Sequence, residues 1–345
     1  MKALMYTAPK TLEIVEVPKS EAGEGEVLLQ VLASNICGSD VHGWYGENGR
    51  RVAPLVMGHE FSARVEALGG GVKQLSVGDV VAVQPCISCF SCPVCASGMN
   101  QICPSKRFLG VFTTHGGMQE YLTVPARHCF RLPSGLSPHA ASLTEPFAVS
   151  YAAVEKAGDL RDKTILIIGG GTIGLLALMV AKLQHPKKIA VSDVSPARLE
   201  LAKQFGATDL INPAKEDFAA RIEEVFGGKK AEVTLEAVGK ELAVAQAISA
   251  TASGGICVWI GLDQKMITVD MQDIVAREIT IKGTYVYNHE TFGKALELLP
   301  KLDLDLFLSH CLQLPLEEAG AMFAALADEP EKCLRSAIMF ARGDA

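Results

Sequence analysis

Short alternating runs of apolar and polar residues fill the chain up to about residue 145, and glycine or proline separates them. Successive side chains of a strand point to opposite faces of a sheet, so this alternation predicts strands with one buried face. The opening segment MKALMYTAPKTLEIVEV alternates in the same way. We therefore predict a small antiparallel barrel with inserted loops, with strands in EVLLQVLAS, FSARVEAL, DVVAVQP and EYLTVPA.

From Lys163 the pattern changes, because apolar runs typical of buried strands now alternate with amphipathic segments typical of helices. Strands are expected in TILIIGG, KIAVSD, TDLINP, EVTLEAVG, ICVWIGL and TIKGTY, and helices in PARLELAKQFG and ELAVAQAISATASG. This order predicts a parallel sheet with helices on both faces. After Tyr287 come isolated helices (ETFGKALELL, LEEAGAMFAALA) and a strand-like SAIMFA, which we expect to fold back onto the first domain. The chain is thus an α/β protein, with one domain from residues 1–147 and 288–345 and a doubly wound domain from residues 148–287.

The composition agrees with two compact domains. A chain of 345 residues exceeds what one hydrophobic core usually supports, and 49% hydrophobic with 21% charged residues is ordinary for a soluble protein. The net charge of −7, without a basic run, argues against nucleic acid as a partner. No apolar run reaches membrane-spanning length, and the start lacks the layout of a signal peptide. We expect a cytoplasmic protein with neither a nucleic-acid nor a membrane partner.

Ten cysteines are present, and five of them lie between Cys86 and Cys103, which favours metal binding over disulfides. Four thiolates leave no open coordination position, so a four-cysteine set is typical of a structural zinc. Two sets are possible, because Cys86 is evenly spaced with the first three cysteines that follow it. We favour the set that ends in Cys103, with Cys86 as a spare thiol; its members are Cys89, Cys92, Cys95 and Cys103.

A second, scattered group has the composition of a catalytic zinc site. Cys37 lies in CGSDVH, and His59 and Glu60 follow about twenty residues later in GHE. A thiolate, an imidazole and a carboxylate are a plausible set of three protein ligands that leaves a fourth position for substrate. Glu145 is a further carboxylate, where the chain passes between domains. Each residue also has an ordinary structural explanation, with Cys37 in the core, His59 as a satisfied buried histidine and Glu60 as a surface charge.

The segment GGGTIG satisfies the G-x-G-x-x-G pattern between an expected strand and an expected helix, which predicts a dinucleotide site. Gly169 allows the tight turn, Gly171 lets the backbone approach the pyrophosphate, and Gly174 lets the helix pack on the sheet. Asp193 closes the next strand at the position expected for a ribose-binding carboxylate, although it could instead cap a helix that begins at Pro196. A carboxylate there repels a 2′-phosphate, so NAD is favoured over NADP. Arg198 could lie against the adenosine.

Five segments (CGSDVH, GHEFSARV, the four-cysteine lobe, LTEP and GGGTIG) occur in the order seen in the medium-chain, zinc-dependent alcohol dehydrogenases, and the chain resembles that family over nearly its whole length. It looks most like the branch of sorbitol, galactitol-phosphate and threonine dehydrogenases, because TEP stands where the ethanol-oxidising branch has a cysteine. The resemblance implies a Rossmann domain, a GroES-like β-barrel catalytic domain, NAD, and two zinc ions per subunit. It also implies a homo-oligomer, with a tetramer favoured and a dimer possible.

The resemblance assigns roles residue by residue. The catalytic zinc is held by Cys37, His59 and Glu60, and Glu145 ligates it or orders its water. Asp40 fixes a ligand histidine, while Ser39 and His42 relay the proton. The cofactor contacts come from Ile173, Asp193, Arg198, the backbone around Gly261 and the backbone of residues 284–286. Sorbitol dehydrogenases typically carry an arginine where this chain has Val286, and the loop FLGVFTTHGGMQEY also differs from theirs.

The function predicted from these features is oxidation of a secondary hydroxyl on a small polar alcohol, a sugar alcohol or vicinal diol. A carboxylate-rich metal shell is harder than one with two thiolates and so suits oxygen ligands. The alternatives are a threonine dehydrogenase, a sugar-alcohol-phosphate dehydrogenase and a catalytically silent dinucleotide-binding protein, although a silent member would have lost a zinc ligand. Neutral hydrogen-bonding groups expected near the substrate are Thr113, Thr114, His115, Tyr285, Tyr287, Asn288 and His289.

Overall fold

The computed structural model describes residues 1–46 and 49–340, and these divide into two compact units. The first unit contains Met1–Glu145 and the segment from Asn288 onward, and the second contains Pro146–Tyr287. The boundary after Glu145 lies two residues before the end expected from the sequence, inside helix α4 (Thr144–Ala157). Each unit has its own hydrophobic core.

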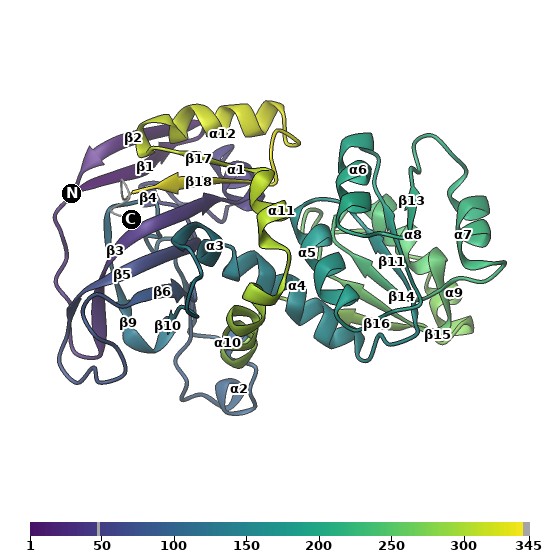
Figure 1. The fold of residues 1–345 in the computed structure, drawn as a ribbon, viewed down its shortest axis with the longest axis horizontal. Helices are drawn as coiled ribbons and strands as arrows, with labels where there is room; N and C mark the ends of the chain where they lie inside the picture. Colours follow the sequence, from purple (N-terminus) through teal and green to yellow (C-terminus); the bar gives the residue numbers. More distant parts are fainter. Residues whose placement is uncertain (47–48, 341–345) are drawn as a thin grey trace. The chain divides into compact units, whose positions relative to one another are not determined.

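Two main sheets form the first unit, and they are mostly antiparallel, as the alternating pattern predicts (Figure 1). The larger runs β10-β6-β5-β3-β18-β17, with β9 also paired to β3, and the smaller runs β2-β1-β4. The pair β17–β18 is parallel. The strands are β1 (Lys2–Ala8), β2 (Thr11–Glu16), β3 (Glu26–Ile36), β4 (Leu55–Val56), β5 (Glu60–Leu68), β6 (Val80–Val83), β7 (Cys86–Ile87), β8 (Arg107–Phe108), β9 (Tyr121–Pro125), β10 (Cys129–Arg131), β17 (Cys311–Leu314) and β18 (Arg335–Met339).

Strand β3 is the centre of this unit because both of its faces are buried. Val27, Leu29 and Val31 pack on Phe61 in one core, while Ile36 belongs to the other core. The helices around these sheets are α1 (Gly38–Trp44), α2 (Pro93–Ala96), α3 (Pro138–Ser142), α10 (His289–Leu298), α11 (Leu304–Ser309) and α12 (Ala319–Asp328), and the 3-10 turns are η1 (Asn100–Ile102), η2 (Ala126–His128), η3 (Leu299–Lys301) and η4 (Leu316–Glu318).

The C-terminal segment returns to the first unit, as predicted. Its last strand, β18, pairs antiparallel with β3, so that Ser336 lies opposite Ile36 and Met339 opposite Ala33. Helix α11 and strand β17 were not expected from the sequence. They are short, and β17 exposes Leu312 and Gln313, so its pattern carries little hydrophobic signal.

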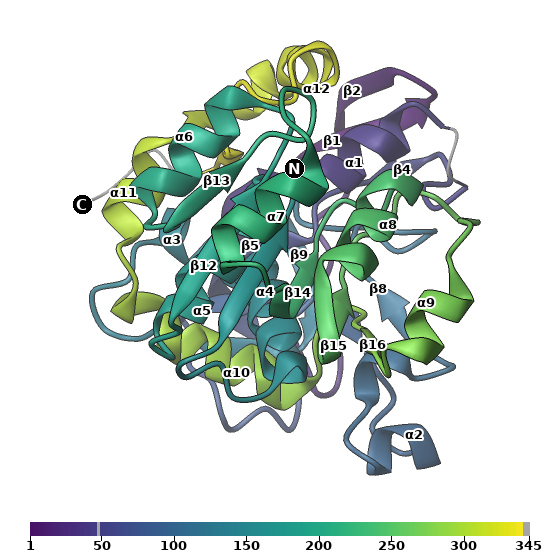
Figure 2. The same cartoon turned by 90° about the vertical axis from the view of Figure 1, so that its right-hand side faces the viewer.

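The second unit is a parallel sheet of six strands in the order β13-β12-β11-β14-β15-β16, which is the doubly wound arrangement of a Rossmann domain (Figure 2). Leu166 and Ile168 of β11 pack with helices α7 and α8, while Ile167 faces Gly174 of α5. Helices therefore cover both faces. The strands are β11 (Thr164–Ile168), β12 (Lys188–Ser192), β13 (Asp209–Ile211), β14 (Ala231–Glu236), β15 (Thr251–Trp259) and β16 (Thr280–Gly283), and the helices are α5 (Thr172–Lys182), α6 (Pro196–Gln204), α7 (Phe218–Phe226), α8 (Glu241–Ala250) and α9 (Met271–Ala276).

One helix ends earlier than the sequence suggested. The segment from Thr251 to Gly254, expected at the end of a helix, already belongs to strand β15. Thr251 has extended dihedrals, and its hydroxyl pairs at 2.7 Å with that of Thr234 on β14. A β-branched residue with a partner on the neighbouring strand favours the strand here. Within residues 1–46 and 49–340, no helix combines the length and hydropathy needed to cross a membrane.

Candidate active site

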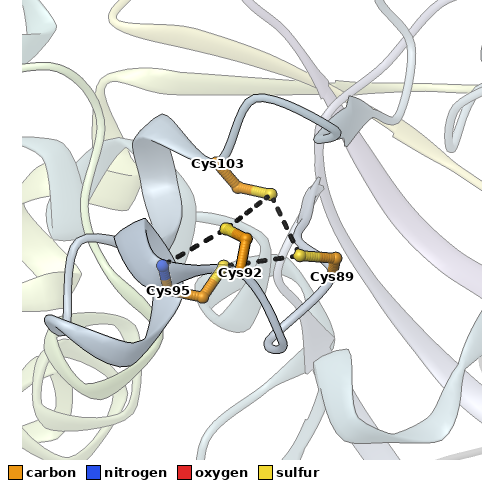
Figure 3. A group of neighbouring side chains, drawn as sticks. All are labelled: Cys89, Cys92, Cys95 and Cys103. Atoms are coloured by element: carbon orange, nitrogen blue, oxygen red, sulfur yellow. Dashed lines mark hydrogen bonds between the residues drawn. The ribbon is translucent and has the colours of Figure 1, made fainter.

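The cysteine lobe brings four sulfur atoms together (Figure 3). The Sγ of Cys89 lies 3.8 Å from that of Cys95 and 3.5 Å from that of Cys103, and the Sγ of Cys92 lies 3.9 Å from that of Cys103. Ligands on a regular tetrahedron around zinc, each about 2.3 Å from the metal, are about 3.8 Å apart. The spacing thus fits one tetrahedral ion. Hydrogen bonds from Ser91 also lower the pKa of the Cys89 thiol, which favours the thiolate that zinc requires.

Cys86 lies outside this group. It is buried on β7, its Sγ contacts the carbonyl oxygen of Gln101 at 3.8 Å, and burial raises the pKa of its thiol to about 11. The sulfur atoms close enough to share one ion are those of Cys89, Cys92, Cys95 and Cys103, and that of Cys86 is not among them. The structure thus brings together the set that ends in Cys103.

The second metal group forms because β3 and β5 are neighbours. Cys37 follows β3 and is the N-cap of α1, and Glu60 begins β5, directly opposite Asn35 of β3. One ligand atom each from Cys37, His59 and Glu60 lie within 4.8 Å of one another. His59 and Glu60 are 6% and 0% exposed, so Glu60 is no surface charge.

Asp40 links this group to helix α1. Its Oδ2 accepts the Cys37 backbone N–H at 3.2 Å, and its Oδ1 lies 3.4 Å from His59 Nδ1 and 2.7 Å from Arg51 Nη2. Burial opposes ionisation of Asp40, but the charges of His59 and Arg51 outweigh it and lower the pKa of the carboxyl. Because Nδ1 faces Asp40, Nε2 of His59 is left for a metal.

Arg335 of β18 is a site residue that sequence reasoning missed. Its Nε and Nη2 donate to the two oxygens of Glu60 at 2.9 Å each, and Nη2 lies 3.9 Å from Cys37 Sγ. Burial disfavours its charge, but Glu60 and Cys37 raise the pKa of the guanidinium. Each carboxylate oxygen has a second lone pair, so the ion pair still permits Glu60 to ligate a metal.

Glu145 begins α4 and is 5% exposed, but it is not a member of the three-ligand group. Its charge acts on Arg335, so it lies within electrostatic reach of that group.

Burial lowers the pKa of His59, yet the negative charges of Asp40 and Cys37 outweigh this and raise it well above its ordinary value. A thiol, an imidazole and a carboxylate whose ligand atoms lie within 4.8 Å of one another are donors that suit a zinc ion.

The glycine turn has the geometry of a phosphate-binding turn. Gly169 has φ +100°, and a Cβ on Gly174 would lie 1.8 Å from the carbonyl oxygen of Gly169, so only glycine fits at that place. Beside Gly171 the space is open, and no side chain caps the start of α5 there. An uncapped helix N-terminus offers its N–H groups and the positive end of its dipole to an anion. This arrangement fits the pyrophosphate of a dinucleotide.

Asp193 follows β12 and its two oxygens accept the backbone N–H groups of Gly170 at 2.7 Å and Ser195 at 2.8 Å. The N-cap of α6 is Ser195, so Asp193 is not that cap. Arg198 Nη1 lies 3.8 Å from Asp193. A Cβ on Gly261 would lie 2.0 Å from the backbone nitrogen of Gly239. Because glycine has no Cβ, the loops after β14 and β15 can touch here.

Several residues expected near the cofactor or substrate make contacts within the chain itself. Ile173 is partly exposed at the start of α5, and its carbonyl accepts from Ser150 at 2.9 Å. Tyr287 is 1% exposed and Asn288 caps α10, while His289 Nδ1 donates to Gln84 Oε1 at 2.7 Å. In the structure, packing, capping and a hydrogen bond account for these last three side chains.

The remaining candidates lie at the surface or carry backbone strain. Thr113 and His115 are exposed, although His115 Nδ1 accepts the backbone N–H of Val56 at 3.0 Å. His42 is exposed in the last turn of α1, and Ser39 is exposed one turn earlier. Val286 has φ +42°, an unusual conformation for a β-branched residue and one that costs free energy.

Two family profiles match the chain, an "alcohol dehydrogenase GroES-like domain" at residues 23–134 and a "zinc-binding dehydrogenase" at residues 172–301. The chain is 36% identical to the L-threonine 3-dehydrogenase of Pyrococcus horikoshii, covering 90% of this chain and 91% of that protein. It is 34% identical to the sorbitol dehydrogenase of Bacillus subtilis, covering 87% and 86%. The solved 2R,3R-butanediol dehydrogenase of Bacillus subtilis superposes with a TM-score of 0.89 and 28% identity over 99% of both chains. These similarities confirm the fold class predicted from the sequence.

Proposed function

Because this chain belongs to the medium-chain, zinc-dependent alcohol dehydrogenases, we propose that it oxidises a secondary hydroxyl of a polyol or vicinal diol and transfers the hydride to NAD. The alcohol dehydrogenase activity follows from the family. The substrate class and the choice of NAD are the proposal.

The observation that carries the substrate class is the donor set of the second metal group. It contains one thiolate, one imidazole and one carboxylate, with a further buried carboxylate at Glu145 in electrostatic reach. Such a set is harder than one with two thiolates and favours additional oxygen ligands. A vicinal diol offers two oxygens, so it should bind better than a simple alcohol. The sorbitol and butanediol dehydrogenases among the similar proteins act on such compounds by name.

In this proposal, Cys37, His59 and Glu60 hold one zinc per subunit and the cysteine lobe holds a second, structural one. A bound zinc supplies Lewis acidity that lowers the pKa of an alcohol hydroxyl. Ser39 accepts the hydroxyl proton, and the exposed His42 exchanges it with solvent. The positive end of the α1 dipole and the Arg335 guanidinium lie beside Cys37.

NAD is preferred to NADP in this proposal because Asp193 lies at the end of β12, where a ribose 2′-hydroxyl is bound in this fold. Its carboxylate would accept a hydrogen bond from that hydroxyl and repel a 2′-phosphate. Arg198 carries a positive charge that could attract a 2′-phosphate, but its Nη1 lies 3.8 Å from Asp193 and already pairs with that carboxylate.

A homo-oligomer, with a tetramer favoured and a dimer possible, is also part of the proposal. Large apolar side chains are exposed along one segment of the second unit, which argues for a partner surface there; they are Leu262, Met266, Met271 and Val275. Ten unpaired cysteines suit a reducing compartment, so we propose the cytoplasm. We propose neither a nucleic-acid nor a membrane partner.

A second candidate is oxidation of threonine, favoured by the 36% identity to a threonine dehydrogenase. A sugar-alcohol phosphate is a third candidate substrate.

A substrate panel assayed with NAD at alkaline pH separates these candidates. It contains ethanol, hexanol, L-threonine, 2,3-butanediol, sorbitol, galactitol and galactitol 1-phosphate. We expect at least one polyol or diol to have the highest kcat/KM. A preference of about tenfold or more for a primary alcohol, threonine or the phosphate, which is about 1.4 kcal/mol, would overturn the proposal.

A further inference from the structure

Arg51 is a buried cation beside the second metal group to which neither sequence pattern nor comparison assigns a role. Its side chain is 3% exposed, and its Nη2 lies 2.7 Å from Oδ1 of Asp40, which is 0% exposed. A buried ion pair is weak grounds for stability, because desolvation offsets most of the attraction. Its Nε has no hydrogen-bond partner among the described residues, which adds to that cost. The position of this arginine therefore calls for another explanation.

The structure fixes the side chain of Arg51 from two sides. A Cβ on Gly43 of α1 would lie 2.3 Å from Arg51 Cγ, so the aliphatic stem lies against the helix backbone where only glycine leaves room. The Arg51 backbone forms a parallel bridge with Phe112. The guanidinium is thus held in one place relative to Ser39 and Asp40 on α1.

Arg51 also reaches Ser39, the hydroxyl to which we assign proton transfer. Its Nη2 donates to Ser39 Oγ at 3.3 Å, and since a guanidinium has no acceptor, Ser39 must be the acceptor of this bond. The second neighbour of Ser39 Oγ is Nε2 of His59, at 3.5 Å. That nitrogen is the one left for a metal, because Nδ1 faces Asp40. When Nε2 binds a metal, neither Arg51 nor His59 can accept a hydrogen bond from the Ser39 hydroxyl. The hydroxyl hydrogen must therefore point to a third group.

We propose that Arg51 is a positioning residue that orients the Ser39 hydroxyl for proton transfer; this rests on the proposed dehydrogenase function. Ser39 Oγ accepts the proton of the substrate hydroxyl while its own hydrogen passes to the next acceptor. Arg51 keeps all its protons throughout. The Arg51 N–H occupies one lone pair of Ser39 Oγ and thereby sets the direction of the other lone pair and of the hydroxyl hydrogen. The positive charge of Arg51 also disfavours a Ser39 hydroxyl that holds two protons, so the proton is passed on.

The test compares Arg51→Lys and Arg51→Met with Arg50→Met, a control at the exposed neighbouring arginine. Lysine keeps the charge, but its ammonium rotates on a flexible stem, whereas the planar guanidinium fixes the directions in which Nη2 donates to Asp40 and Ser39. We expect kcat on the best substrate of the panel to fall about tenfold to a hundredfold, up to the lower limit of general acid–base effects, because Arg51 acts only through Ser39, with KM for NAD unchanged. The solvent deuterium isotope effect on kcat should rise, because proton transfer becomes slower than hydride transfer. Arg50→Met should behave as wild type.

Two further measurements separate this role from metal binding and from folding. Zinc content and the visible spectrum of the Co²⁺-substituted protein should be unchanged in Arg51→Lys. In the Ser39→Ala background, Arg51→Lys should add little, because both changes act on the same proton. The inference is overturned by full additivity, or by a perturbed Co²⁺ spectrum with an unchanged isotope effect, which would mean that Arg51 supports only the ligand. Since the assay uses whichever alcohol is oxidised best, a wrong substrate class leaves this test valid, whereas no turnover on any alcohol refutes the proposed function itself.

Discussion

Two acidic side chains around the second metal group each have a basic partner. Asp40 pairs with Arg51 and Glu60 pairs with Arg335, and the buried members of these pairs are almost fully removed from water. Glu145 adds a third buried carboxylate, in electrostatic reach of Arg335. Buried charges persist only when they are paired, and a divalent cation held by Cys37, His59 and Glu60 would add positive charge beside these carboxylates.

Asp193 tests the coenzyme choice at the scale of one residue. We expect Asp193→Ser to weaken NAD binding by roughly 1.5–3 kcal/mol, the loss for a hydrogen bond to a charged group, and to improve kcat/KM with NADP. The carboxylate also accepts two backbone N–H groups, so Asp193→Asn, which keeps one acceptor without the charge, controls for loosening of the turn. Steady-state kinetics with both coenzymes and melting curves of both variants provide the measurement. A wild-type enzyme that prefers NADP would contradict the assignment.

At this scale, the sequence predicts ligands that are close together along the chain and misses partners that are distant. The cysteines of the lobe span Cys89 to Cys103, and the local spacing alone indicates a metal. Arg335 meets Glu60 across 275 positions, through the pairing of β18 with β3. Arginine in the mostly apolar strand segment RSAIM was an available signal, since a cation in a buried strand needs a buried anion. Arg51 gave no such signal, because it lies in a polar loop.

Among the elements, the cysteine lobe has little secondary structure of its own, with only α2 and η1 between its outer cysteines. A metal that binds only the folded lobe contributes its binding free energy to folding. We expect Cys103→Ser to remove one zinc per subunit and to destabilise the first unit by at least ~2 kcal/mol, a decrease in Tm of roughly 4–8 °C. Cys86→Ser is the matched control and should keep both zinc ions. The opposite pattern, with zinc lost from Cys86→Ser alone, would show that the lobe uses the other set of cysteines.

A cluster of two imidazoles ties the same lobe to the sheet beneath it. Gln84 Oε1 accepts from Nδ1 of His128 at 3.1 Å and from Nδ1 of His289 at 2.7 Å, and the His289 backbone N–H donates to Asn100 of the lobe at 2.9 Å. The ring of Phe90 lies against both imidazoles. Burial, and then the charge of His289, lowers the pKa of His128 to about 3. His128 is therefore neutral in the folded protein across the physiological range.

This depressed pKa makes folding sensitive to acid. The unfolded chain takes up the His128 proton below pH 6.5 while the folded chain does not, so the stabilisation is complete above pH 6.5 and is lost as the pH falls toward 3. The loss is at most about 1.4 kcal/mol per pH unit for this one group. Urea unfolding at pH 7.5, 6 and 5 should show a smaller decline for His128→Gln than for wild type, and exposed His185→Asn should follow wild type. Equal slopes for all three proteins would mean that His128 does not carry the effect.

The elements that the sequence predicted well are those with a strong hydrophobic pattern. All six strands of the second unit were expected, because parallel strands buried on both faces read as continuous apolar runs. Thr251 to Gly254 was misassigned, since one threonine and three small residues after a helix carry no period, and the cross-strand contact between Thr251 and Thr234 decides their conformation. The same lack of signal explains α11 and β17.

For the whole molecule, the two units have separate cores, and the metal group and the glycine turn lie on different units. The free-energy effects of mutations at distant, independent sites usually add to within about 0.5 kcal/mol, so a change at one site hardly alters binding at the other. We therefore expect Cys37→Ser or His59→Ala to abolish turnover and to empty the second metal group, while the Kd for NADH, measured by fluorescence, stays within that range of wild type.

The converse variant is Gly174→Ala in the second unit. Its Cβ would lie 1.8 Å from the Gly169 carbonyl oxygen, so the turn must move and the pyrophosphate site with it, and NADH binding should be lost. Zinc content should remain that of wild type, because both metal groups belong to the first unit. A folded Cys37→Ser protein that no longer binds NADH, or a folded Gly174→Ala protein that has lost zinc, would contradict this division. Either result would mean that the two sites depend on each other to form, and that binding of metal and of dinucleotide is cooperative rather than separately built into each unit.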